Sequence, residues 1–212
     1  MAKKILTLNI GATNVTLAEY DCSAKGTLTL SRYGMSPLAA PIDGGNTETI
    51  LAPALLDIVR TSGIRPGKVN ISVPGQMVFP KFAAVPHVGD DERFESLVRI
   101  EIEQNIPFPA DEMICDRQIL GETVDGDKSV MIVAAKVDQI ESICAAITSV
   151  GFSPEIVDVS PIALVNAIRN TRKGEEEECI VILDIGARTT SLAIVEGDKL
   201  YNRSIPVAGN AI

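Results

Sequence analysis

Two short segments of the sequence, residues 8–18 and 183–193, carry residue types that could bind phosphate. Each places Asn or Asp two positions before a glycine, as Asn9-Ile10-Gly11 in the first segment and Asp184-Ile185-Gly186 in the second. Because glycine lets a ligand approach the backbone closely, the N–H groups of such a turn can point at phosphate oxygens. The carboxylate of Asp184 could also hold Mg²⁺ through water, since Mg²⁺ prefers carboxylate oxygens and keeps several water ligands.

The two segments are copies of one another. Over eleven aligned positions six residues are identical, and the copies lie about 175 residues apart. One glycine turn alone is a weak signal, because the glycine of an ordinary hairpin would look the same. A matched pair indicates an internal duplication and predicts two like-folded halves that face one cleft. The predicted phosphate-binding residues are Asn9, Gly11, Ala12, Thr13, Asn14, Asp184, Gly186, Ala187, Arg188, Thr189 and Thr190, with Asp184 as the metal-organising group.

The composition argues against several classes of function. The net charge is −9 and no basic cluster is present, whereas a nucleic-acid surface needs the opposite sign. His87 is the only histidine, so a catalytic triad or a His-built zinc site lacks its residues. The widely spaced Cys22, Cys115, Cys144 and Cys179 predict free thiols in a reducing compartment. No segment has the length of a membrane span, and we expect a cytoplasmic chain without direct membrane insertion.

The elements that must position the two turns are β-meanders. Apolar runs predict three strands around each turn, at residues 5–10, 15–21 and 27–33 and again at residues 180–185, 190–196 and 199–205. Residues 78–151 have the pattern of a β-α-β-β-α unit inserted between them. We therefore expect an α/β fold in four parts: residues 1–76 begin the first domain, 77–154 form an inserted subdomain, 155–172 complete the first domain, and 173–212 begin a second. We expect this second domain to be truncated, since a helix should start where the sequence stops.

The paired turns resemble the phosphate-binding loops of the actin/Hsp70/FtsA superfamily. Within it, the Glu-rich residues 101–105 followed by Ile-Pro-Phe-Pro at 106–109, and Asp-Arg-Gln-Ile-Leu-Gly at 116–121, resemble the PilM family of actin-like type IV pilus assembly proteins. The resemblance runs over the whole chain. It implies an actin/Hsp70-like ATPase fold, ribonuclease H-like in its core, with an FtsA-type inserted subdomain. It also implies that ATP and Mg²⁺ bind at the two turns.

The PilM resemblance implies a protein partner in place of a small substrate. In this family the cytoplasmic tail of the inner-membrane protein PilN binds in a groove between the inserted subdomain and the first domain. Such a partner would hold the chain at the inner membrane. We place the groove at Pro74, Gly75, Phe79, Arg99 and Glu103. The residues leave open whether the chain also forms a homo-oligomer.

Three positions argue that ATP is held without fast turnover, and we predict no catalytic residue. Asn9 stands where related turns carry Asp, so Mg²⁺ loses an anionic ligand. Thr16 stands where related proteins often carry Lys, and Ser160 stands where Hsp70-like proteins place a glutamate near the attacking water. Serine is a poor base at neutral pH. Two alternatives stay open: the cytoplasmic domain of a GspL-like type II secretion protein, and an actin-fold ATPase or sugar kinase.

Overall fold

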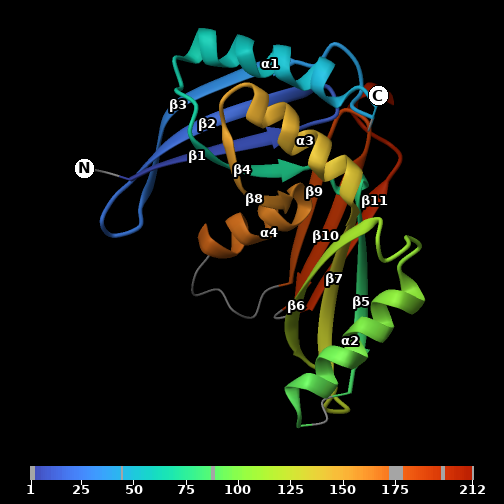
Figure 1. Ribbon diagram of the computed structural model, residues 1–212. Helices are drawn as coiled ribbons and strands as arrows, with labels where there is room; N and C mark the ends of the chain where they lie inside the picture. The colour runs from blue at the N-terminus through green and yellow to red at the C-terminus, as the bar shows by residue number, and fades with distance from the viewer. Residues whose placement is uncertain (1–2, 44, 87–88, 172–178, 197–198, 212) are drawn as a thin grey trace.

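Alternating apolar residues in the first part of the chain build a five-stranded sheet. In the computed structural model its strand order is β3-β2-β1-β4-β8. Strands β1 to β3 form an antiparallel meander, whereas β1, β4 and β8 are parallel, so that their carboxyl ends meet at one edge (Figure 1). The strands are β1 (Lys3–Ile10), β2 (Asn14–Cys22), β3 (Leu28–Pro37), β4 (Lys68–Val73) and β8 (Ser153–Val159).

The structure describes residues 3–43, 45–86, 89–171, 179–196 and 199–211. His87 and the predicted charged linker at residues 173–178 lie outside these ranges. The four cysteines are unpaired thiols, as predicted. Within the described ranges, no helix has the length and apolar character needed to cross a bilayer.

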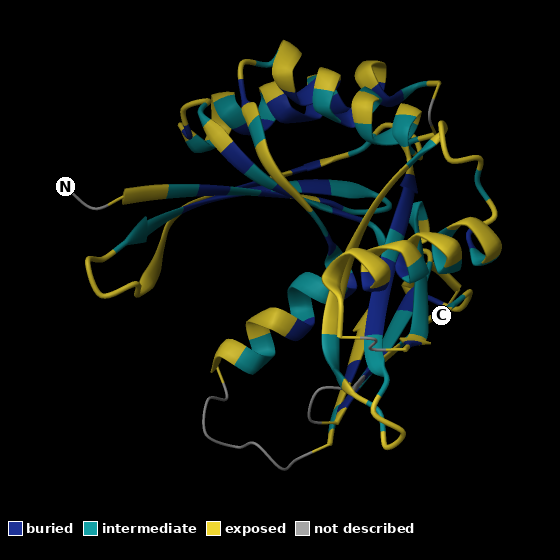
Figure 2. Cartoon of the chain, turned by 60° about the horizontal axis from the view of Figure 1, so that its bottom comes forward, coloured by how far each residue is buried: buried dark blue, intermediate teal, exposed yellow. Residues whose placement is uncertain are grey.

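Two helices, α1 (Thr47–Ser62) and α3 (Val137–Ser149), cover one face of the five-stranded sheet. Their inward sides are buried and their outward sides are exposed (Figure 2). The core joins Leu51, Leu55 and Ile58 of α1 and Ile143, Ala146 and Ile147 of α3 to the alternate residues Leu6, Leu8 and Ile10 of β1. The sequence assigned α3 to the inserted subdomain, but the structure packs it on the first sheet beside α1.

The insertion itself is a three-stranded antiparallel sheet with the order β5-β7-β6. Its strands are β5 (Val78–Val85), β6 (Met113–Glu122) and β7 (Lys128–Lys136). Helix α2 (Asp91–Asn105) covers one face, and Phe94 and Val98 are buried there against Val130, Ile132 and Ala134 of β7. The helix begins where the Asp90 side chain accepts a hydrogen bond from the Glu92 N–H, a usual N-cap.

The second meander forms a separate sheet, β9 (Ile180–Ile185), β10 (Thr190–Glu196) and β11 (Lys199–Ile205), in the order β11-β10-β9. Helix α4 (Ser160–Thr171) connects this sheet to the first one and contacts β4, β8 and β10. A third apolar core joins the inserted sheet, helix α4 and the second meander. Its buried residues are Met131 of β7, Val165 of α4, and Ile182, Ala193, Val195 and Leu200 of the second meander.

A buried carboxylate stabilises the meander β1–β3. Glu19 of β2 has only 6% of its side chain exposed, and its Oε1 accepts hydrogen bonds from Lys4 Nζ at 2.6 Å and from Ser31 Oγ at 3.0 Å. Arg32 lies 4.0 Å from the same oxygen. The hydrogen bond from Lys4 is the main reason that the pKa of Glu19 is lowered, and Ser31 and Arg32 act in the same direction.

We expect Glu19→Gln to lower the free energy of unfolding at pH 7 and to have less effect in acid. Because the pKa of Glu19 is lower in the folded chain than in the unfolded one, ionised Glu19 stabilises the fold above the unfolded pKa of about 4.3. This stabilisation is lost as the pH falls through the folded pKa. Urea unfolding of both proteins between pH 7 and pH 3 measures the difference. Asp21→Asn is the control, because Asp21 is 43% exposed and should show little change. A difference that stays constant with pH would contradict the assignment.

Candidate functional site

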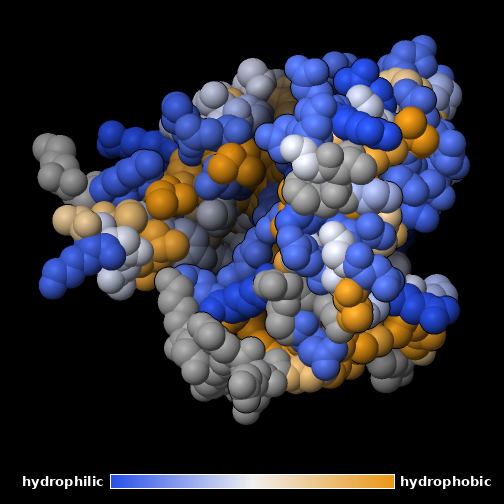
Figure 3. All heavy atoms as spheres, turned by 90° about the horizontal axis from the view of Figure 1, so that it is seen from below, coloured by the Kyte–Doolittle hydropathy of each residue, from blue (hydrophilic) through white to orange (hydrophobic). Residues whose placement is uncertain are grey.

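The two glycine turns line one cleft of about 840 Å³ between the first sheet and the second meander. Seen from below, the molecule is hollowed beside the N-terminal strands (Figure 3). The structure thus brings together residues that are about 175 positions apart. Of the predicted phosphate-binding residues, the lining includes Asn9, Gly11, Ala12, Thr13, Asn14, Asp184, Gly186, Ala187, Arg188 and Thr189.

The two turns have the same backbone geometry. In the first, the Gly11 N–H donates to the Asn14 carbonyl oxygen at 2.8 Å, and in the second the Gly186 N–H donates to the Thr189 carbonyl oxygen at 3.0 Å. A Cβ atom added at Gly11 would lie 2.9 Å from the Asn14 carbonyl oxygen, and one at Gly186 would lie 2.8 Å from that of Thr189. Both contacts are too close for a side chain, so the tight turn requires glycine at each position.

In each turn, a backbone N–H group from outside the turn donates a hydrogen bond to a carbonyl group of the turn. The Leu38 N–H donates to the Thr13 carbonyl at 2.9 Å, and the Asn210 N–H donates to that of Ala187 at 3.1 Å. In the described ranges no acceptor is found for the N–H groups of Ala12 and Thr13, or for those of Ala187 and Arg188. Each turn therefore offers unsatisfied backbone donors, the arrangement that binds anions such as phosphate.

The charged residues among those that line the cleft are Asp158, Asp184 and Arg188. Arg188 can pair with phosphate oxygens in two parallel hydrogen bonds. The described residues contain no group of three metal-ligating side chains. Asp184 could therefore hold Mg²⁺ only together with phosphate oxygens and water, which agrees with the few direct protein ligands that Mg²⁺ usually takes in nucleotide sites.

Asn9 has a structural role that the sequence did not reveal. Its Oδ1 accepts a hydrogen bond from Ser160 Oγ at 3.1 Å, and Ser160 Oγ lies 2.9 Å from Ser72 Oγ. Since the Ser160 hydroxyl has one proton and gives it to Asn9, Ser72 must donate to Ser160. These two hydrogen bonds connect the ends of β1 and β4 with the start of α4.

Thr190 does not line the cleft, which corrects its predicted role. Its hydroxyl donates to the Val207 carbonyl oxygen at 2.6 Å, and its side chain is buried. The aligned position in the first copy is Val15, which is fully buried. This alignment was the signal that could have identified Thr190 as a core position of β10.

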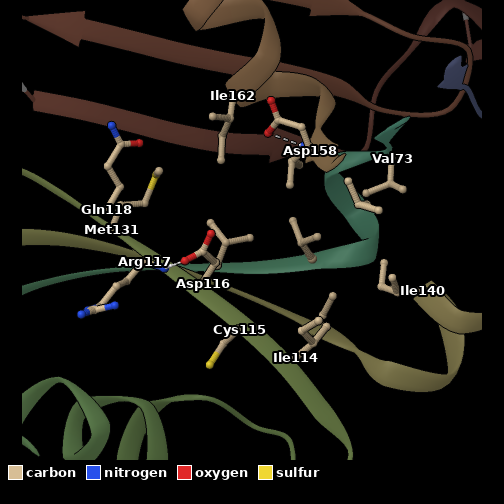
Figure 4. A pocket seen from close by; sticks show the side chains of 15 residues that line it. Val73, Ile114, Cys115, Asp116, Arg117, Gln118, Met131, Ile140, Asp158 and Ile162 are labelled. Atoms are coloured by element: carbon tan, nitrogen blue, oxygen red, sulfur yellow. Dashed lines mark hydrogen bonds between the residues drawn. The ribbon is translucent and has the colours of Figure 1, made fainter. Parts of the chain in front are cut away.

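A second hollow of about 740 Å³ lies between the inserted sheet and the end of β8 (Figure 4). It is mainly apolar, with two carboxylates that point into it, those of Asp116 and Asp158. Its lining consists of Val73, Val78, Ile114, Cys115, Asp116, Arg117, Gln118, Met131, Val133, Ala135, Ile140, Val157, Asp158, Val159 and Ile162.

The five residues predicted to form a peptide groove do not line one common hollow in the structure. Pro74 and Gly75 line the cleft of the glycine turns, and Phe79 packs edge-to-face on Phe108, with ring centroids 6.5 Å apart. Arg99 and Glu103 are exposed on α2. The reason is that α2 covers the face of β7 formed by Val130, Ile132 and Ala134, while the hollow lies on the face formed by Met131, Val133 and Ala135.

The sequence is similar to one protein family over nearly its whole length: residues 7–212 match the family described as type IV pilus assembly protein PilM. Among solved structures, the chain is similar to the PilM-PilN type IV pilus biogenesis complex, with a TM-score of 0.84 and 25% identity. That match covers 99% of this chain and 63% of the other, so the chain spans just under two thirds of that relative.

Two more distant structures show the fold alone. The cytoplasmic domain of EpsL, an inner membrane component of the type II secretion system of Vibrio cholerae, matches with a TM-score of 0.61 and 10% identity, over 96% of this chain and 71% of that chain. A Bacteroides thetaiotaomicron protein with an actin-like ATPase fold matches with a TM-score of 0.52 and 9% identity, over 98% and 72%. The predicted actin-like fold is confirmed.

We expect Gly11→Ala and Gly186→Ala each to weaken nucleotide binding by roughly tenfold or more, because the added Cβ opens the turn and turns its N–H donors away. Titration of a fluorescent ATP analogue measures the dissociation constant. The matched control is Gly67→Ala, since a Cβ at Gly67 meets only Leu6 Cδ1 at 3.7 Å. Equal affinities for the three variants and the unaltered protein would show that the turns do not bind the nucleotide.

Proposed function

The chain belongs to the family of type IV pilus assembly protein PilM, and on this premise we propose that it is an actin-like scaffold of pilus assembly that holds ATP and docks a membrane partner. The partner is the N-terminal cytoplasmic tail of a PilN-like inner-membrane protein. The observation that carries the proposal is the convergence of two glycine turns with one geometry on one cleft. The family match favours this function over a GspL-like protein or a sugar kinase.

In the proposed nucleotide site, both turns contribute donors to the phosphate groups. The N–H groups of Ala12, Thr13, Ala187 and Arg188 and the guanidinium of Arg188 would contact phosphate oxygens. Asp184 would orient Mg²⁺ through water. When bound, Mg²⁺ would neutralise phosphate charge and fix the conformation of the phosphate chain. The chain's own residues supply the positioning.

The hydrogen bonds around Ser160 favour a structural role for the nucleotide over turnover. The Ser160 hydroxyl donates to Asn9 and accepts from Ser72. The Ser160 hydroxyl and the Asn9 amide oxygen are therefore both engaged in hydrogen bonds that hold the ends of β1 and β4. Neither a serine hydroxyl nor an amide acts as a base for water at neutral pH. The charged groups of the two turns are Asp184 and Arg188, and in this proposal Asp184 orients Mg²⁺ and does not act as a base.

The second hollow supports the docking half of the proposal. It has an apolar lining, an open side and two carboxylates, which suits a short extended peptide better than a second nucleotide. The solved relative is named as a complex of PilM with PilN. Docking through this hollow would place the chain on the cytoplasmic side of the inner membrane by means of its partner.

We expect no steady phosphate release from ATP by this 212-residue chain above that of an Asp184→Ala variant. The reason is that the proposal assigns Asp184, the carboxylate of the turns, to Mg²⁺, while Ser160 and Asn9 are not bases for water at neutral pH. A coupled phosphate assay over several hours measures the rate. A release that the Asp184→Ala substitution abolishes would contradict the scaffold assignment and indicate an ATPase.

We expect the N-terminal cytoplasmic peptide of the PilN-like protein encoded beside this gene to bind the intact protein, and Ile114→Glu to abolish binding. Ile114 lines the hollow and is 54% exposed, so a charge there should exclude an apolar peptide without disturbing the core. Val124→Glu is the matched control, because Val124 is fully exposed on the turn after β6. A pull-down with the peptide and its scrambled version measures both. Absence of binding at high micromolar peptide would contradict the proposed docking.

A further inference from the structure

The free edge of β6 forms one wall of the second hollow. Strand β6 is the outer strand of the inserted sheet, and among the strands of the described ranges it pairs with β7 alone. Five consecutive residues of β6, from Ile114 to Gln118, line the hollow. Because successive side chains of a strand point to opposite faces, a face could contribute only every second residue. The strand therefore borders the hollow with its edge, where backbone N–H and C=O groups lack a partner strand.

The opposite wall is also the border of a sheet. Strand β8 is the outer strand of the five-stranded sheet, and three of its consecutive residues, Val157, Asp158 and Val159, line the same hollow. Large apolar side chains next to these edges are exposed: Ile114 by 54%, Ile119 by 50% and Val157 by 39%. An uncovered apolar strand edge is prone to pair with another chain, so such an edge in a native protein usually has a partner.

The charges in the hollow indicate the chemistry of that partner. Asp116 and Asp158 point into it from opposite walls (Figure 4). Within the described part of the chain, their side chains accept hydrogen bonds only from adjacent backbone N–H groups, that of Arg117 at 2.8 Å and that of Val159 at 2.7 Å. The guanidinium of Arg117 pairs with Glu95 of α2, on the other face of the sheet. Among the described lining residues, the hollow therefore has an excess of negative charge, and a cationic side chain would complement it.

We propose that the docked tail adds a β-strand to the free edge of β6 and places a Lys or Arg side chain between Asp116 and Asp158. This inference rests on the proposed docking function and specifies its mode. Backbone hydrogen bonds to β6 supply affinity, and side-chain contacts supply selectivity. The tail residues two positions before and after the cation lie on the same face and are apolar, because they contact Val133 and Ile162.

Backbone N-methylation of the peptide tests the added strand without altering the protein. The probe is the PilN-like N-terminal peptide, methylated at one backbone nitrogen at a time, and its dissociation constant is measured by fluorescence polarisation. In a strand paired along one edge, every second N–H points to the neighbouring strand. We expect methylation at alternate positions to weaken binding roughly tenfold or more, with little effect at the positions between. Uniform tolerance or uniform loss along the peptide would overturn the added strand.

Charge substitutions test the cation. Asp116→Asn and Asp158→Asn should each weaken binding roughly tenfold. Asp125→Asn, on the exposed turn after β6, should not. Replacing the peptide's Lys or Arg by norleucine should remove the sensitivity to both substitutions, whatever their effect on stability. Unchanged affinity in the Asn variants, or a tail without Lys or Arg, would overturn the cation site.

The same measurements separate the inference from the function on which it rests. If the unmodified peptide fails to bind the unaltered protein at high micromolar concentration, the proposed docking fails, and the added strand fails with it. If the unmodified peptide binds but N-methylation does not weaken binding at alternate positions, the docking function stands and only the added β-strand is overturned.

Discussion

The parallel pairing of β1, β4 and β8 is the constraint from which the rest of the structure follows. It brings three carboxyl ends to one edge of the first sheet, and the hydrogen bonds from Ser72 to Ser160 and from Ser160 to Asn9 hold those ends together. The first glycine turn and helix α4 both begin at this edge. Ligand sites in open α/β sheets form at such an edge for the same reason, because loops and helix N-termini gather there.

Helix α4 transmits this arrangement to the second half of the chain. It packs on the first sheet at its start and joins the second meander and the inserted sheet through the core around Val165. That core determines where the second glycine turn lies relative to the first. The β8–α4 junction also separates the cleft from the second hollow, and Asp158 lines both. The two candidate binding sites are thus neighbours that share one wall.

The two copies of the turn show which features a duplicated site retains. The glycine and its hydrogen bond to the carbonyl three residues later are the same in both, whereas the carbonyl groups held from outside the turn differ, that of Thr13 in the first and those of Gly186 and Ala187 in the second. The residue two positions before the glycine has diverged: it is a carboxylate, Asp184, in the second copy, whereas in the first it is Asn9, whose amide oxygen accepts a hydrogen bond from Ser160 at the start of α4. Val15 and Thr190 are both buried, although one is a hydrocarbon and the other donates to Val207. Backbone geometry has been retained more strictly than side-chain chemistry.

The sequence by itself determined the strands, the helices, the paired turns and the free thiols. These follow from short-range periodicity, from turn chemistry and from the repeat, all of which are local in the chain. Only the tertiary structure decided that α3 packs on the first sheet, that Thr190 faces the core, and that the second hollow is bordered by β6 instead of α2. The physical reason is that a period shows which residues share a face, whereas the partner of that face is chosen by packing between distant segments. The free edge of β6 became visible for the same reason, since the absence of a partner strand is a property of the assembled sheet.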